Sequence, residues 1–137
     1  AAKIIADFDI IACTDVTGFG LLGHLAEMVG GSGCSVRIFS GRVPVIPEAM
    51  GFAAMGLIPA GAYKNREFRE QMITFAETVP RTTQDLLFDP QTSGGLLISV
   101  SDAHCKDLVS ALKDGGITNA AHIGDIVDSH EEIISVV

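Results

Sequence analysis

Asp15 is the acidic side chain in this sequence best placed to bind a cation. It follows an apolar stretch, residues 8–13, that is typical of a β-strand, and it precedes a turn with Gly18 and Gly20. A carboxylate at a strand exit can face solvent or a divalent cation. Magnesium prefers one or two protein carboxylates, with water and substrate phosphates as its other ligands. The alternative is structural, because Asp15 or Thr17 could cap the following helix.

The turn after Asp15 offers mainly backbone groups. Glycine lets the chain approach a neighbour closely, and free N–H groups in the first turn of a helix favour negative charge. Thr17, Gly18 and Gly20 could therefore lie close to substrate; alternatively, they could position Asp15 without binding a ligand themselves.

A second polar loop, residues 89–95, precedes another apolar strand. Pro90 and the paired glycines punctuate it strongly, so no regular structure is expected there. Its hydroxyls, amide and N–H groups could hold an anion or clamp a neighbouring loop near substrate; alternatively it is only a tight turn into the strand. The candidate residues are Gln91, Thr92, Ser93, Gly94 and Gly95.

Other reactive residue types are expected to have structural roles. Cys13 lies close to Asp15, but no Lys or Arg lies nearby in sequence to lower the pKa of its thiol. Cys34 and Cys105 are expected to be buried. His24 either faces a partner across small residues or is a partly exposed helix histidine. The basic cluster at residues 64–66 is expected to form a solvated loop.

The helix that must position Asp15 begins near Gly20 and ends at about Val29. Leu22, Leu25, Ala26 and Val29 follow the spacing of a buried helical stripe, and residues 30–33 end the helix.

The other elements alternate irregularly along the chain. Residues 60–62 are expected to form a loop and 68–76 a helix; Thr83 is expected to cap a short turn to Leu87. The final two strands are expected to pair as a hairpin through 128–130. These features favour one α+β domain, a mixed β-sheet flanked by α-helices. Further predicted elements are strands 34–39, 96–100, 122–127 and 132–137, a helix 48–55 started by Pro47, and a helix 102–113 capped by Ser101.

Composition narrows the classes of function. Of 137 residues, 47% are hydrophobic and 19% charged, which suits a single packed domain. The net charge of −8 argues against nucleic-acid binding. No apolar run approaches the ~20 residues that cross a bilayer, and no signal peptide is expected. Three cysteines without paired spacing argue against disulfides and zinc, so the expected compartment is the cytoplasm.

Four segments resemble selenophosphate synthetases, in order and with plausible spacing. Phe19 together with residues 21–24 separates this family from aminoimidazole ribonucleotide synthetase, thiamine monophosphate kinase and a hydrogenase maturation factor, which share a looser pattern. The resemblance covers nearly the whole chain. The segments are residues 14–25, 56–66, 87–96 and 121–127.

The resemblance implies the C-terminal domain of a two-domain enzyme with an aminoimidazole ribonucleotide synthetase-like fold. That family makes selenophosphate, AMP and phosphate from ATP, selenide and water. Its N-terminal domain forms the homodimer and most of the ATP site, and it carries a reactive cysteine and an essential lysine. No segment here matches those features. The resemblance further implies that Asp15 joins a Mg²⁺ cluster, and that this chain alone is inactive.

Two other readings stay open at this stage. One is the C-terminal domain of another ATP-dependent enzyme of the superfamily, of the aminoimidazole ribonucleotide synthetase or thiamine monophosphate kinase type. The other is a non-catalytic module that binds a protein or a small anion through its glycine-rich surface.

Overall fold

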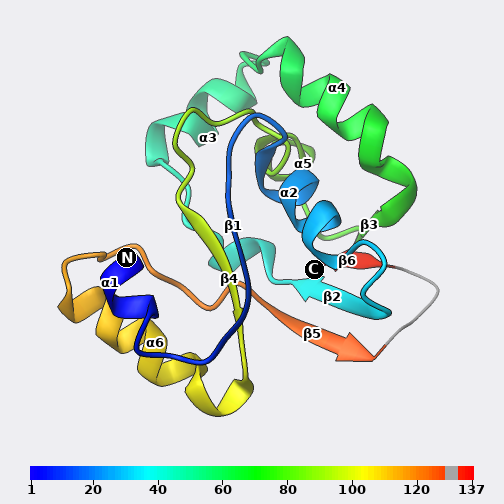
Figure 1. Ribbon diagram of the computed structural model, residues 1–137. Helices are drawn as coiled ribbons and strands as arrows, with labels where there is room; N and C mark the ends of the chain where they lie inside the picture. The colour runs from blue at the N-terminus through cyan, green and yellow to red at the C-terminus, as the bar shows by residue number, and fades with distance from the viewer. Residues whose placement is uncertain (129–132) are drawn as a thin grey trace.

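Two β-sheets organise the chain, with helices around them (Figure 1). The computed structural model describes residues 1–128 and 133–137. Strands β1 (Ile10–Asp15) and β4 (Leu96–Val100) pair antiparallel as a two-stranded sheet. The second sheet has four strands, in the order β3 (Ile73–Phe75), β6 (Ile134–Val136), β2 (Cys34–Ile38) and β5 (Gly124–Asp128). Because β6 runs parallel to β3 and β2 whereas β5 runs antiparallel to β2, this sheet is mixed, as the sequence predicts.

The helices fall into two groups in space. The short α1 contacts α6 at one end of the molecule, and α3, α4 and α5 lie together at the other (Figure 1). No helix within residues 1–128 and 133–137 is long and apolar enough to cross a membrane. The helices are α1 (Ala2–Ile5), α2 (Gly20–Val29), α3 (Pro47–Ala54), α4 (Ala60–Arg69), α5 (Arg81–Leu86) and α6 (Asp102–Asp114), with 3₁₀ turns η1 (Ser40–Arg42) and η2 (Glu70–Met72).

The core forms between α2 and the four-stranded sheet. The predicted stripe of α2 is confirmed, since Leu22, Leu25, Ala26 and Val29 are all buried. Phe88 is fully buried in the same cluster. The sheet contributes apolar side chains that alternate along its strands, as one buried face requires. Members from the sheets include Val36, Ile38, Ile73, Leu97, Ile134 and Val136.

The predicted terminal hairpin is wrong. Strand β2 lies between β5 and β6, so that Val36 faces Ile126 on one side and Ile134 on the other. The reason is burial: Ile134 and Val136 are almost fully covered in the interior of the sheet, which a two-stranded hairpin could not achieve. Of the predicted turn at 128–130, residues Ser129 and His130 lie outside the described residues.

The segment 60–76 also differs from prediction. Residues 60–62 open helix α4 instead of forming a loop, and the expected helix at 68–76 becomes the end of α4, η2 and strand β3. Helix α4 packs closely on Pro90 at Gly61, because a Cβ added to Gly61 would lie only 3.1 Å from Pro90 Cγ. Strand β3 forms because Ile73 pairs with Ile134 of β6, a long-range contact that outweighs the local pattern.

Smaller corrections concern element boundaries and caps. Strand β1 runs two residues further than expected and ends on Asp15 itself. Thr83 lies inside α5, whose N-cap is Pro80. Ser101 is the N-cap of α6 but makes no side-chain capping bond. Strand β4 is buried at alternate residues only, so it has one exposed face. The short helix α1 was not expected.

Truncating an isoleucine should lower the free energy of unfolding far more at the centre of the four-stranded sheet than at its edge. We expect Ile134→Ala to lower the free energy of unfolding by about 2–5 kcal/mol, because Ile134 is fully buried. Ile126→Ala on edge strand β5, where the side chain is 50% exposed, should cost about 1 kcal/mol or less. Urea denaturation measures both; similar losses would contradict this sheet order.

Candidate functional site

Asp15 is exposed at the open end of strand β1. Its side chain lies on the same face of the strand as exposed Cys13, and it stands opposite Leu96 of β4, which is 43% exposed. Within residues 1–128 and 133–137 its carboxylate has no hydrogen-bond or ion-pair partner. A carboxylate so placed is free to accept a ligand from outside this chain.

The chain immediately after Asp15 is bonded by its backbone to the loop before β4. Val16 N–H donates to the Gly95 carbonyl at 2.9 Å, and Gly94 N–H donates to the Val16 carbonyl at 2.9 Å. Gln91 N–H donates to the Thr17 carbonyl at 3.0 Å. We call these contacts between residues 16–17 and 91–95 the two-loop junction. It joins the two segments that the sequence singled out.

Two glycines make this close approach possible. Gly20 has a φ of +71°, and an added Cβ there would lie 2.6 Å from the backbone carbon of Phe88. At Gly94 an added Cβ would lie 2.8 Å from the Val16 carbonyl oxygen. No real side chain tolerates such distances, so glycine is required where the two segments meet.

The hydroxyl of Thr17 bonds to a buried histidine rather than capping a helix. Thr17 Oγ1 lies 3.0 Å from Nε2 of His24, whose residue is only 8% exposed. The N-cap of α2 is Phe19, and no side chain caps this helix. The alternative reading of Asp15 or Thr17 as a helix cap is therefore wrong, and so is the reading of His24 as partly exposed.

Helix α4 fastens the same turn from another side. Asn65 donates its side-chain amide to the Gly18 carbonyl at 2.9 Å and to the Phe88 carbonyl at 3.0 Å. Sequence reasoning expected 64–66 to be a solvated loop, which is wrong. Arg66 instead binds Asp85 at 2.9 Å and Gln84 at 2.6 Å, and its guanidinium lies over the ring of Phe88. The role of Asn65 was missed because its partners are backbone carbonyls, which leave no trace in sequence.

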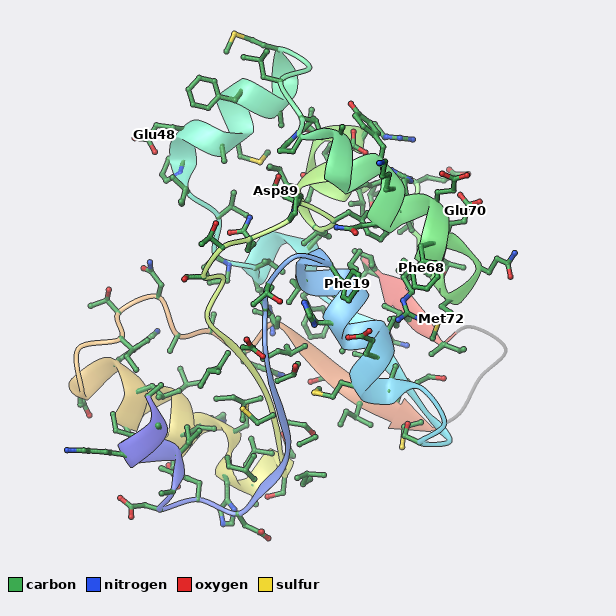
Figure 2. All side chains as sticks on the ribbon, turned by 45° about the horizontal axis from the view of Figure 1, so that its top comes forward. Phe19, Glu48, Phe68, Glu70, Met72 and Asp89 are labelled. Carbon is green, nitrogen blue, oxygen red and sulfur yellow. The ribbon has the colours of Figure 1, made fainter. Side chains whose placement is uncertain are left out.

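The residues of the loop before β4 differ in their exposure to solvent. Thr92, Ser93, Gly94 and Gly95 are exposed, whereas Gln91 is half-buried and donates its side-chain amide to the Asp89 carboxylate. Burial raises the pKa of Asp89, and the hydrogen bond from Gln91 opposes part of that rise. Asp89 comes directly after Phe88, whose backbone lies against Gly20 at the start of α2. Phe19 lies at the same end of that helix (Figure 2).

The cysteines are less buried than the sequence suggested. Cys34 is exposed, which contradicts the expected burial, and Cys105 is half-buried on α6. Burial is the largest cause that raises the pKa of the Cys105 thiol, aided by Asp102 and Asp125, so this thiol is poorly reactive. Cys13 is exposed near Asp15.

One carboxylate cannot by itself form a cation site. Within the described ranges, no group of three or more His, Cys, Asp or Glu side chains gathers to hold a metal. Asp15 nevertheless fits magnesium, because that ion takes one or two protein carboxylates and completes its shell with water and phosphate oxygens. Any such site would draw its remaining ligands from beyond these residues.

Comparisons with known proteins cover the whole chain. The sequence model of the family described as AIR synthase related protein, C-terminal domain, matches residues 1–137. The chain is 56% identical over 136 residues to the selenide, water dikinase of Pelobacter propionicus. It is 46% identical over 140 residues to that of Treponema denticola and 44% identical over 136 residues to that of Clostridioides difficile. Each match covers 99% of this chain but only 39% of the relative's length.

The close approach at Gly20 can be separated from ordinary backbone strain. Gly31 has a φ of +74° but open space around it, so Gly31→Ala should cost about 1–2 kcal/mol from the left-handed conformation alone. Gly20→Ala carries the same strain and a clash with Phe88, which should add about 1–3 kcal/mol. Urea denaturation of the two variants measures the difference. Equal losses would show that the contact between the start of α2 and Phe88 does not require glycine at position 20.

The raised pKa of Asp89 predicts a specific dependence of stability on pH. The contribution of this carboxyl is fully present below the ordinary aspartate pKa of about 3.9 and is lost as pH rises through the raised value. The stability of the wild type relative to Asp89→Asn should therefore fall with rising pH. Gln91→Leu removes the amide that favours the ionised form, so it should deepen that loss and extend it to higher pH.

Urea midpoints across an acid-to-neutral pH series test this dependence. A difference between the wild type and Asp89→Asn that stays constant or grows with pH would contradict the assignment.

Proposed function

The chain belongs to the AIR synthase related protein family, as a copy of its C-terminal domain, and on that premise we propose that it forms the C-terminal domain of a selenide, water dikinase. The relatives that carry this name are about 2.5 times as long as the matched region, since the match covers 39% of them. The proposed enzyme makes selenophosphate, AMP and phosphate from ATP, selenide and water in the cytoplasm. The chain alone is inactive in this proposal.

The observation that carries the proposal is the position of Asp15. Its carboxylate is exposed, unpartnered within the described residues, and held at a strand end by the two-loop junction. The strand face around it bears Ile11 at 66% exposure and Leu96 at 43% exposure. Apolar side chains beside a charged group suit a surface that another domain covers. That domain is the N-terminal part of the same enzyme, which also forms the homodimer and most of the ATP site.

The chemistry follows from charge. ATP phosphates repel one another and repel an anionic nucleophile, and a bound Mg²⁺ supplies charge neutralisation for phosphoryl transfer. In this proposal Asp15 is the one carboxylate that this domain adds to the Mg²⁺ site. The bonded backbone at Val16 and Thr17 holds the end of β1 in place, so only the side-chain torsions of Asp15 remain to be ordered when the domains close.

The proposed roles of the remaining candidates are supporting ones. Thr17, Gly18 and Gly20 position Asp15, because the carbonyls of Thr17 and Gly18 accept from Gln91 and Asn65 and the N–H of Gly20 donates to the Thr17 carbonyl. In the loop before β4, Gln91, Gly94 and Gly95 serve the two-loop junction. The side chains of Thr92 and Ser93 are exposed, and in this proposal they lie close to substrate.

Asp15→Asn should abolish most magnesium-dependent turnover without unfolding the protein. The test enzyme is a chimera in which this chain replaces the matching 136 residues of the Pelobacter propionicus relative. We expect a loss of about 100-fold or more in selenide-dependent ATP turnover, since even outer groups of a metal site contribute 10–100-fold. The urea midpoint should hold, because Asp15 is exposed and unpartnered within the described residues.

Asp9→Asn is the matched control, because Asp9 is an exposed carboxylate just ahead of the same strand. It should keep the activity of the parent chimera. Turnover of Asp15→Asn equal to that of Asp9→Asn would refute the role of Asp15.

A further inference from the structure

We propose that His24 is the positioning residue for Asp15, acting through the hydroxyl of Thr17; this rests on the function proposed above. His24 is one of few polar side chains buried among the described residues. Both of its ring nitrogens face a partner: Nε2 lies 3.0 Å from Thr17 Oγ1, and Nδ1 lies 3.4 Å from Glu27 Oε2. A histidine that only filled space on α2 would need neither contact.

The proposal includes the tautomer of the ring. The carboxylate of Glu27 can only accept and lies 3.4 Å from Nδ1, so the ring proton is placed on Nδ1. Nε2 is then the acceptor, and the Thr17 hydroxyl donates to it. The ring therefore fixes the direction of the Thr17 side chain.

Thr17 is the residue at which this side-chain bond meets the backbone bonds of both loops. Its carbonyl accepts the N–H of Gly20 at 3.0 Å and that of Gln91 at 3.0 Å. The preceding residue, Val16, is bonded on both its N–H and its carbonyl to Gly95 and Gly94. The bond from Thr17 to His24 therefore adds a side-chain link to the backbone bonds that hold the two residues after Asp15.

The outer end of this network is anchored to a different helix. Arg69 of α4 donates to Glu27 Oε1 at 3.3 Å, and Asn65 of the same helix donates to the Gly18 carbonyl. The ring centroid of Phe19 lies 5.4 Å from that of His24, with the two rings tilted. Figure 2 shows Phe19 at the start of α2. Helix α4 thus contacts the turn in two ways. Asn65 bonds directly to Gly18, and Arg69 bonds to Glu27, which lies beside His24.

The first test measures the magnesium requirement of the chimera described above. Thr17→Val keeps the shape of the side chain but removes the hydroxyl, and His24→Ala removes its acceptor. We expect each to raise the Mg²⁺ concentration for half-maximal turnover by about 10-fold or more, in the range of groups that orient metal ligands. The double variant should be no worse than the more affected single variant, because both changes break one link. His24→Gln, which can accept from Thr17, should recover part of the loss.

Leu25→Ala is the matched structural control. Leu25 is buried on the same helix but lies in the apolar stripe, so its loss should lower the urea midpoint and leave the Mg²⁺ requirement unchanged. If Leu25→Ala raised the Mg²⁺ requirement as much as His24→Ala, or if the effects of Thr17→Val and His24→Ala multiplied in the double variant, the positioning role would be overturned.

A second readout does not depend on activity. ¹⁵N NMR of the chain labelled at histidine should show His24 with its proton on Nδ1 and should show a shift of the Nε2 resonance in Thr17→Val. A proton on Nε2, or no response to Thr17→Val, would overturn the inference while leaving the role of Asp15 intact. An inactive parent chimera would overturn the proposed function, and the role of His24 toward magnesium with it.

Discussion

The backbone contact between residues 16–17 and 91–95 is the constraint on which the rest of the candidate site depends. Three N–H···O bonds of 2.9–3.0 Å join residues that are 74–79 positions apart in sequence. Gly94 permits this approach, because a Cβ there would meet the Val16 carbonyl oxygen, and Gly20 permits the adjoining contact with the backbone of Phe88. The end of β1 is thereby fixed without the use of the Asp15 side chain, which stays available at the surface.

The junction is rigid because a packed core lies directly beneath it. Leu22 and Phe88 are fully buried, and the N–H of Leu22 donates to the Leu87 carbonyl at 3.1 Å, so α2 begins against the loop that it helps to hold. The side-chain amide of Asn65 donates hydrogen bonds to the carbonyls of Gly18 and Phe88. The carbonyls of Val16, Thr17, Gly18 and Phe88 thus all have hydrogen-bond donors, as buried polar groups require. A loop held in this way suits a metal ligand, whose direction matters more than its own stability.

The sequence predicted those features that depend on local spacing. The stripe on α2, the glycine-rich turn after Asp15 and the irregular loop before β4 follow from periodicity and from the conformational needs of glycine and proline, and the structure confirms them. What failed was set at long range. Whether Ile73 belongs to a helix or a strand depends on Ile134, and whether β5 pairs with β6 depends on β2 coming between them. Asn65 was undervalued because its partners lie 47 and 23 residues away in the sequence. The partners of His24 lie within seven residues, but helical spacing alone does not show that its ring is buried.

The two faces of the β1–β4 sheet have different surroundings. One face of β1 and β4 covers the core through Leu97, whereas the other presents Asp15, Cys13 and Leu96 to the outside. In the proposed function, the N-terminal domain of the same enzyme covers this second face. Cys13 is a natural probe of the claim, because it is exposed on the same face as Asp15, two residues away. Exposed Cys34 at the start of β2 serves as the internal reference.

Thiol alkylation followed by mass spectrometry, residue by residue, tests the claim most directly. The account predicts that Cys13 reacts as readily as Cys34 in this chain alone, and that it becomes at least about 10-fold slower than Cys34 in the full-length chimera with Mg²⁺ and a non-hydrolysable ATP analogue, as access-controlled thiol chemistry requires. An unchanged ratio of the two rates would show that this face stays open in the complete enzyme, and the account of Asp15 as a shared ligand would then be wrong.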